Sequence, residues 1–329
     1  GFLSGKAPSS GLGFTLSFLT TNICLFSPLP ASSLTFTFIT LTIFPIRALP
    51  SGVSKRALSP TFIFNSILYK ILNEIKLKKK IISLLYLMES PYITILTPTY
   101  DRKKFLPLMM LNVFLQSYPK DKIEWLICDS YSYEGKKADK LLVDDELKLM
   151  RKKLSPTVVN YHYLEKQMSI GEKRNWLVKN SKYKLMINMD SDDIYLGNYC
   201  RNIVAALQLP KVEIAGSPEM AFIYPNHNYQ FSMIRCEHYR QIHEGAMGFT
   251  KKHWKRMGGF NKEGTGEGAG LFDGCSDKYF KKLPINDLMI CVCHSDNTCD
   301  KDIFLEHKIE IENFDPPQLK LLKEHIFVS

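Results

Sequence analysis

From residue 92 onward, continuous apolar runs alternate with segments that have the apolar spacing of amphipathic helices. The apolar runs predict buried strands at 92–97, 123–128, 158–163 and 184–189. The other segments predict helices at 102–117, within 136–153, at 171–180 and near 198–208. Such alternation implies an α/β fold with a mostly parallel central sheet flanked by helices.

The pattern changes after residue 213. It predicts strands with polar turns over 213–235, a strand-to-helix turn at 248–257, a strand at 287–293 and a peripheral helix at 317–325. We therefore expect a single folded domain over residues 88–310, followed by a C-terminal helix or tail over 311–329.

Residues 1–87 have a different composition. No Lys, Arg, Asp or Glu lies between Lys6 and Arg47, but Pro28, Pro30 and Pro45 interrupt this stretch, and the piece 31–44 is too short and too rich in Ser and Thr for a clean membrane span. The first methionine is Met88. We interpret 1–87 as a leader, either disordered or translated from upstream of the true start, with a membrane anchor as the alternative.

The charge of the chain is concentrated in this leader. The net charge is +10, and residues 1–87 hold nine Lys and Arg but one acidic residue, Glu74. The remaining residues are close to neutral, so no nucleic-acid partner is expected. The eight cysteines form no CxxC pair, which favours reduced thiols and a cytoplasmic location, with peripheral membrane association as an open alternative.

Polar residues suited to ligand binding or catalysis follow three of the predicted strands. They are Thr97-Pro-Thr-Tyr-Asp-Arg102, Asp129-Ser130 and Asp190-Ser-Asp-Asp193. Ligands of open α/β sheets bind outside the carboxyl ends of the strands, so these residues are expected to line one crevice.

The segment Asp190–Asp193 carries three carboxylates in four residues. Mg²⁺ and Mn²⁺ prefer carboxylate oxygens and are commonly held together with substrate phosphates. The alternative is that Asp193 caps the next helix while the other two are solvated. Its place directly after a strand favours the metal site, and the imidazole of His294, which follows another apolar run, is a suitable second ligand.

Two further segments carry candidate chemistry. Gly171-Glu-Lys-Arg-Asn175 opens a predicted helix with basic side chains, which suits an anionic or nucleotide ligand, although a solvated basic helix start is an equal alternative. The glycines of 264–270 lack the spacing of a dinucleotide-binding motif. We interpret this segment as a mobile loop that carries Glu267, with Asp273 close behind. Either carboxylate could act as a general base, and a plain surface loop is the alternative.

Together these residues resemble the family 2 glycosyltransferases, which have the GT-A fold. The resemblance covers about residues 92–300, and the set of motifs is similar to that of the glycosyltransferases of large DNA viruses and bacteria. Besides the segments above it includes Gly245-Ala-Met-Gly248, Gly258-Gly-Phe-Asn261 and His294-Ser-Asp-Asn297. Two departures stand out: Asp129 is followed by Ser-Tyr-Ser, and Gly268 follows Glu267 where many relatives have Glu-Asp.

The resemblance implies a role for each candidate residue. Asp129 would bind the base, Asp190 the ribose, and Arg174 and Asn175 the diphosphate or sugar. Asp192 would hold Mn²⁺ or Mg²⁺ with His294, and Glu267, or alternatively Asp273, would be the catalytic base. The implied nucleotide-sugar contacts are Thr97, Thr99, Tyr100, Arg102, Asp129, Lys173, Arg174, Asn175, Asp190 and Ser191.

The activity implied is metal-dependent transfer of a hexosyl or N-acetylhexosaminyl group from a nucleotide-sugar, usually a UDP-sugar, to an acceptor hydroxyl with inversion. The acceptor, whether a glycan, a lipid or a protein, is left open. Two alternatives remain: a nucleotidyltransferase that forms a sugar nucleotide and releases pyrophosphate, and a non-catalytic relative that binds a glycan or nucleotide.

Overall fold

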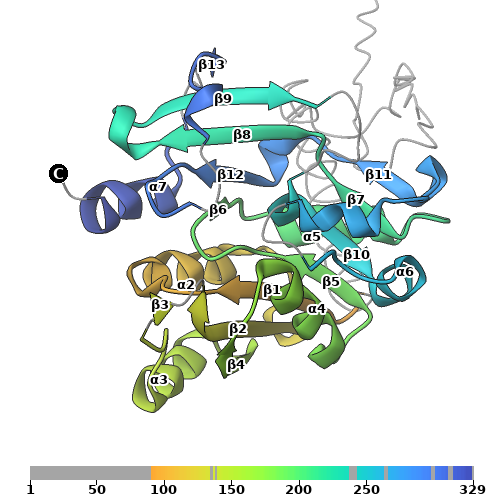
Figure 1. Cartoon of the computed structure of the whole chain (residues 1–329), viewed down its shortest axis with the longest axis horizontal. Coiled ribbons are helices and arrows are strands. Elements are labelled where there is room, and N and C mark those ends of the chain that lie inside the picture. Colours follow the sequence, from red (N-terminus) through yellow and green to blue (C-terminus); the bar gives the residue numbers. More distant parts are fainter. Residues whose placement is uncertain are drawn as a thin grey trace, which may run out of the picture. The chain divides into compact units, whose positions relative to one another are not determined.

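A mixed eight-stranded sheet forms the centre of the molecule in the computed structural model, which describes residues 90–133, 136–137, 139–236, 243–262, 266–297, 301–309 and 314–327. The strand order is β11-β7-β10-β5-β1-β2-β3, and β4 also pairs with β2 (Figure 1). The leader predicted at 1–87 lies outside the described residues. The strands of this sheet are β1 (Ile93–Thr99), β2 (Ile123–Tyr133), β3 (Lys136–Lys137), β4 (Val158–Gln167), β5 (Leu185–Asn188), β7 (Ile214–Gly216), β10 (Met247–Thr250) and β11 (Phe280–Lys282).

The four strands predicted from the first apolar runs are parallel neighbours. β1 pairs in parallel with β2 and with β5, and β4 pairs in parallel with β2. In this register Thr99 lies opposite Asp129, and Leu96 lies opposite Asn188. The α/β fold with flanking helices is confirmed, but the sheet as a whole is mixed because β10 runs antiparallel to both β5 and β7.

A second, five-stranded sheet has the order β13-β9-β8-β12-β6. The two-residue strand β6, which directly follows the Asp190–Asp193 turn, pairs with β12 from almost a hundred residues later. This pairing brings the end of β12, and with it His294, towards the turn. The strands are β6 (Ile194–Tyr195), β8 (Glu219–Tyr224), β9 (Gln230–Arg235), β12 (Met289–Val292) and β13 (Lys308–Ile309).

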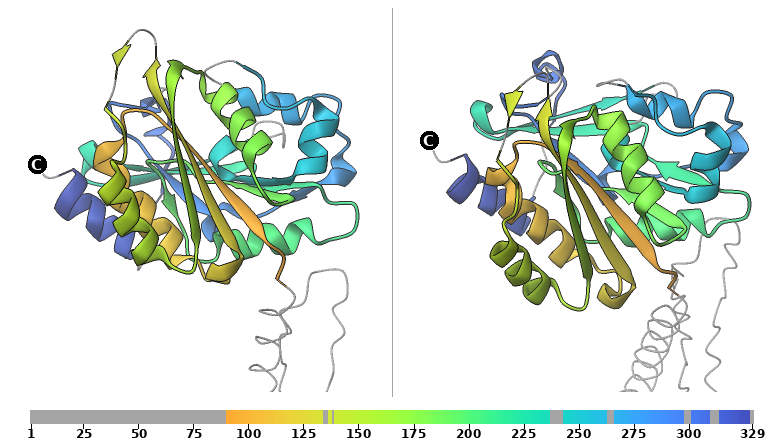
Figure 2. Two further views of the ribbon diagram at one scale, coloured as in Figure 1. Left: turned by 90° about the horizontal axis from the view of Figure 1, so that it is seen from below. Right: turned by 60° about the horizontal axis from the view of Figure 1, so that its bottom comes forward.

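Helices cover both faces of the parallel strands (Figure 2). Because side chains alternate along a strand, Ile93 and Ile95 of β1 join one buried cluster while Leu96 joins another. The first cluster includes side chains of α2 and α3, and the second includes Leu177 and Val178 of α4. The helices are α2 (Leu106–Leu115), α3 (Asp144–Leu154), α4 (Ile170–Asn180), α5 (Tyr199–Leu207), α6 (Lys251–Met257) and α7 (Pro317–Leu321).

Helix α4 begins at a reciprocal cap. The Ser169 hydroxyl accepts a hydrogen bond from the Glu172 backbone N–H at 3.1 Å, and the Glu172 carboxylate accepts one from the Ser169 N–H at 3.0 Å. The first turn also packs tightly on a neighbouring loop, since a Cβ on Gly171 would lie 1.8 Å from the backbone oxygen of Asn261. The glycine therefore sets how closely α4 approaches the segment that precedes Glu267.

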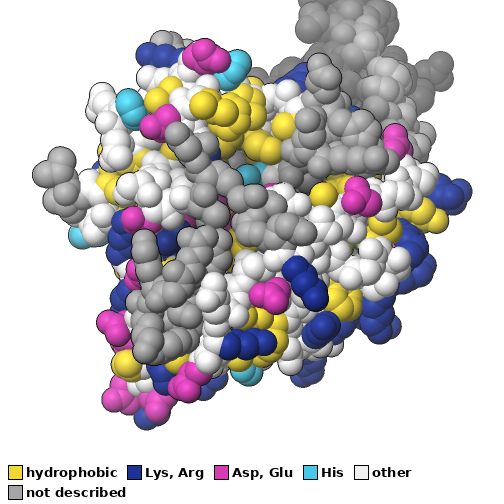
Figure 3. All heavy atoms as spheres, viewed as in Figure 1, with side chains coloured by type: hydrophobic (Ala, Val, Ile, Leu, Met, Phe, Trp, Pro, Cys, Tyr) yellow, Lys and Arg dark blue, Asp and Glu magenta, His cyan; other side chains and the backbone are white. Residues whose placement is uncertain are grey.

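Basic and acidic side chains share the molecular surface (Figure 3). Within the described residues, no helix combines the length and apolar character needed to cross a membrane.

Replacing Gly171 with Ala should destabilise the domain. The added methyl group meets backbone rather than a flexible side chain, so we expect a loss of about 1–3 kcal/mol in the free energy of unfolding, measured by denaturant titration. Gly197→Ala is the control, since its Cβ would lie 3.1 Å from the nearest atom, the Leu115 oxygen. An equal or larger loss in the control would contradict this role for Gly171.

Candidate active site

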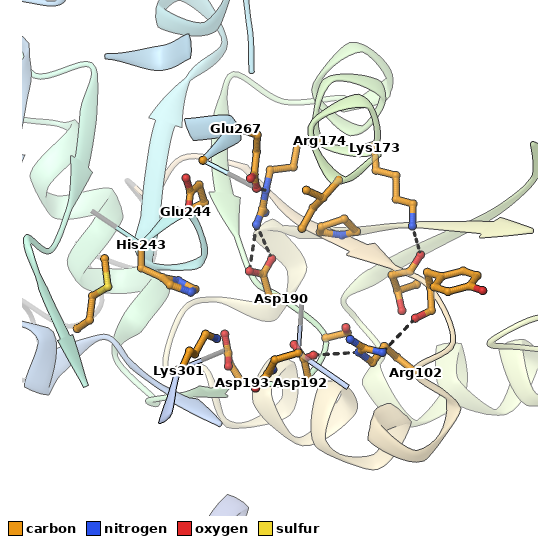
Figure 4. Close-up of a pocket in the computed structure, with 18 of the residues that line it drawn as sticks. Arg102, Lys173, Arg174, Asp190, Asp192, Asp193, His243, Glu244, Glu267 and Lys301 are labelled. Carbon is orange, nitrogen blue, oxygen red and sulfur yellow. Dashed lines mark hydrogen bonds and ion pairs between the residues drawn. The ribbon is translucent and has the colours of Figure 1, made fainter. Parts of the chain in front are cut away.

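A cleft of about 400 Å³ opens at the carboxyl ends of β1 and β5. Basic and acidic side chains from distant parts of the chain meet in it (Figure 4). Nine predicted residues line it: Thr99, Tyr100, Arg102, Lys173, Arg174, Asp190, Ser191, Asp192 and Glu267. The sequence analysis thus brought most of its candidates to one place.

The three carboxylates of the Asp190–Asp193 turn have different partners. Asp190 pairs with Arg174 at 2.9 Å, Asp192 accepts a hydrogen bond from Arg102 Nε at 2.9 Å, and the buried Asp193 accepts one from the Val292 N–H at 2.9 Å. Burial, with the charges of Cys291 and Asp192, raises the pKa of Asp193 well above its usual value. Separate partners explain how these carboxylates lie so close together.

The side chains of Asp192 and His294 could together hold a divalent cation. The Asp192 Oδ2 and His294 Nε2 atoms lie 3.4 Å apart, near the spacing of roughly 3 Å between adjacent ligands of an octahedral ion. Burial would raise the pKa of Asp192, but the hydrogen bond with His294 and the charge of Arg102 outweigh it and hold the pKa below its ordinary value. A carboxylate with an imidazole suits Mn²⁺ better than Mg²⁺, which prefers oxygen ligands.

A second group of donor atoms lies nearby. Ligand atoms of Asp193, His243 and Cys291 lie within 4.8 Å of one another. The Lys301 ammonium, however, lies 2.7 Å from the Cys291 sulfur and already brings a positive charge to this group. Both groups are therefore candidate cation sites, and the second already has a positive charge beside it.

The Arg174 side chain is buried in the wall of the cleft, where it pairs with two carboxylates. Its side chain is 1% exposed; Nε donates to Glu267 Oε1 at 2.8 Å, and Nη2 donates to Asp190 Oδ2 at 3.0 Å. The Glu267 side chain is itself 5% exposed. Burial raises the pKa of Glu267, the Arg174 charge opposes this shift and the charge of Glu244 adds to it.

Lys173, the neighbour of Arg174 on α4, places a second buried cation at the end of β1. Its ammonium donates to the Thr99 carbonyl oxygen at 2.8 Å. Burial lowers the pKa of Lys173 to about 8. The Thr99 hydroxyl is buried, and it has no hydrogen-bond partner in the described part of the chain. It is therefore available to a polar ligand.

Five predicted residues lie outside the lining of the cleft: His294, described above with Asp192, and the four described next. The Asp129 carboxylate is buried and accepts hydrogen bonds from the Tyr161 hydroxyl at 2.7 Å and the Leu141 N–H at 2.9 Å. Thr97 donates to the Met189 oxygen at 2.7 Å, which ties β1 to the chain after β5. The Asn175 amide joins α4 to Phe260, and Asp273 is exposed.

The cleft is also lined by polar residues that were given no role from the sequence, among them His243, Glu244 and Lys301. His243 and Glu244 directly precede the Gly245-Ala-Met-Gly248 segment of the resemblance, and that position was the available signal. Lys301 follows the His294 segment but shows no pattern of its own.

The model of the family described as "Glycosyl transferase family 2" matches residues 94–274, more than half of the chain and nearly the whole cleft. The chain belongs to this family. The resemblance to this family seen in the sequence is thereby confirmed. No curated protein matches the sequence.

Solved structures are similar to this chain at low identity. The mannosyltransferase PcManGT from Pyrobaculum calidifontis, in complex with GDP-Man and Mn²⁺, is 17% identical with a TM-score of 0.47; the match covers 61% of this chain and 56% of that one. S. aureus TarS 1–349 in complex with UDP-GlcNAc is 13% identical with a TM-score of 0.45, covering 63% and 60%. The chain thus spans less than two thirds of either protein.

Lys173 predicts a pH dependence of stability. Its pKa of about 8 lies below the unfolded value of 10.5, so the folded chain loses this proton first and its stability rises with pH between these values. Relative to Lys173→Met, the wild type should gain about 1 kcal/mol in the free energy of unfolding between pH 7.5 and 9. Lys148→Met, at an exposed position, is the control. A pH-independent difference would contradict the lowered pKa.

Proposed function

We propose that this cleft binds a nucleotide-sugar with a divalent cation and transfers the sugar to an acceptor hydroxyl. The observation that carries the proposal is that Asp192, which lines the cleft, lies 3.4 Å from His294, while Lys173 and Arg174 line the same cleft. A departing nucleoside diphosphate needs positive charge around it, and these residues can supply it. When bound, Mn²⁺ or Mg²⁺ would neutralise the diphosphate as a Lewis acid.

The chain's own residues would orient the donor. Arg102, which contacts Asp192 and the Asp296 carbonyl oxygen, and Lys173 lie on the nucleotide side with Thr99 and Tyr100. Asp190, held by Arg174, would accept hydrogen bonds from the ribose. We propose a UDP-sugar as the donor, following the usual choice of the family. Asp129 would contact the base only after a rearrangement that exposes it, because it is buried outside the lining of the cleft.

The acceptor hydroxyl must lose its proton during the transfer. Two carboxylates of the cleft wall can accept it: Glu267, predicted from the sequence, and Glu244. Both lie on the other side of Asp190 from Asp192 in Figure 4. A direct attack from a base on that side would invert the anomeric configuration. Asp273 is exposed outside the lining and is the weaker candidate.

The cysteines of the folded domain bear on the cellular compartment of the protein. The six described cysteines are free, and five of them are buried: Cys128, Cys200, Cys275, Cys291 and Cys293. Free thiols are typical of reducing compartments, which supports the proposed cytoplasmic location.

Removing the proposed metal ligand should abolish turnover. We expect Asp192→Ala to lose at least about 100-fold in Mn²⁺-dependent release of UDP from UDP-glucose or UDP-N-acetylglucosamine, because a charge on the leaving group is left uncompensated. Asp145→Asn, an exposed carboxylate on α3, is the control. Unchanged turnover in Asp192→Ala would remove the metal assignment, and release of pyrophosphate from a nucleoside triphosphate would indicate a nucleotidyltransferase instead.

A further inference from the structure

Glu244 and Gly268 compete for the same space in the cleft wall. The Gly268 N–H donates to Glu244 Oε1 at 3.2 Å. A Cβ on Gly268 would lie 2.7 Å from Glu244 Cγ and 2.9 Å from Oε1, closer than real side chains approach. Here a carboxylate fills the place of a side chain at 268, but it comes from another segment.

Glu267 is already committed to Arg174. Its carboxylate is almost fully buried and accepts the Arg174 Nε–H at 2.8 Å. Protonating Glu267 in each catalytic cycle would remove one of the two anionic partners of a buried guanidinium, and leaving a buried charge without its partner is costly. The raised pKa of Glu267 makes proton uptake easier, but the ion pair gives this carboxylate a different task, which is to hold Arg174 against Asp190.

Glu244 has the freedom that Glu267 lacks. It is partly exposed, and within the described residues the Gly268 N–H is its one hydrogen-bond donor. Figure 4 shows it beside Glu267 and Arg174. The two carboxylates are close enough for the charge of Glu244 to raise the pKa of its neighbour.

The backbone of Glu244 is fixed to the end of β5. Asn188 Nδ2 donates to the Glu244 carbonyl oxygen at 2.7 Å, and the hydroxyls of Tyr195 and Tyr199 donate to the next carbonyl oxygen, of Gly245, at 3.1 and 3.0 Å. Because Asn188 lies two residues before Asp190, Glu244 keeps a constant position relative to the donor site. A general base needs such placement together with free acceptor capacity.

We propose that Glu244 is the catalytic base and that Glu267 is a positioning residue that acts through Arg174. This assignment rests on the proposed glycosyl transfer. The acceptor oxygen bonds to the anomeric carbon while its proton moves to the Glu244 carboxylate. The bond between the anomeric carbon and the diphosphate oxygen breaks, and its electron pair leaves with the diphosphate. Glu244 then returns the proton to solvent.

The first test compares Glu244→Gln with Glu267→Gln. Release of UDP is measured with Mn²⁺ and UDP-glucose, UDP-N-acetylglucosamine or GDP-mannose (release of GDP), with water as the acceptor. We expect Glu244→Gln to lower kcat by about 10²–10⁴-fold and to leave KM for the donor nearly unchanged. Glu267→Gln should raise KM more than it lowers kcat, since it loosens Arg174. Asp145→Asn serves as the folded control.

The second test moves the carboxylate from position 244 to position 268. Glu244→Ala empties the space that a side chain at 268 needs, so Glu244→Ala combined with Gly268→Asp should regain at least about tenfold in kcat over Glu244→Ala. Gly268→Asp alone should lose activity, because the new side chain displaces Glu244. As a measurement that needs no second substitution, added formate should restore part of the turnover of Glu244→Ala and none of that of Glu267→Ala.

The outcomes separate the two proposals. Full kcat in Glu244→Gln together with a loss of at least about 100-fold in Glu267→Gln would overturn the assignment and leave glycosyl transfer standing. A folded double variant without recovery, together with no rescue by formate, would also overturn it. A wild type that neither binds nor cleaves any of the three donors would overturn the proposed function, and the base assignment with it.

Discussion

The buried guanidinium of Arg174 is the contact on which the site depends. It joins α4, the turn after β5 and the segment of Glu267 through ion pairs of 2.8 and 2.9 Å. A buried charge is tolerated only when its partners are in place, and removing one partner of such a pair typically costs about 3–5 kcal/mol. The three segments must therefore assemble together, so the arrangement of the cleft is part of the stability of the fold.

The same principle of paired charges orders the rest of the cleft. Arg102 forms an ion pair with Asp192, and the Lys301 ammonium donates a hydrogen bond to the sulfur of Cys291. These contacts stabilise neighbouring acidic and basic groups in one cavity without a bound ligand. Arg102 and Asp192 lie on one side of Asp190, and the two glutamates lie on the other side (Figure 4).

Local patterns in the sequence predicted much of this arrangement. Apolar runs marked β1, β2, β4 and β5, and the rule that ligands bind at strand ends brought Thr99 and Asp190 to one cleft. Lys173 and Arg174 were instead predicted from the basic start of a helix and from the family resemblance. The patterns could not show that the Asp129 side chain turns towards Tyr161, or that β6 pairs with β12, because such contacts join residues 32 or more positions apart. Glu244 was not assigned for the same reason: its contact is with Gly268, which is distant in sequence and adjacent in space.

The close approach of Gly268 to Glu244 has a consequence for how such enzymes diverge. A side chain at 268 and a long side chain at 244 exclude each other, so neither position can change freely while the other stays the same. The two positions are expected to covary among homologues, and a lineage can exchange the segment that delivers its acidic group without redesigning the cavity around it.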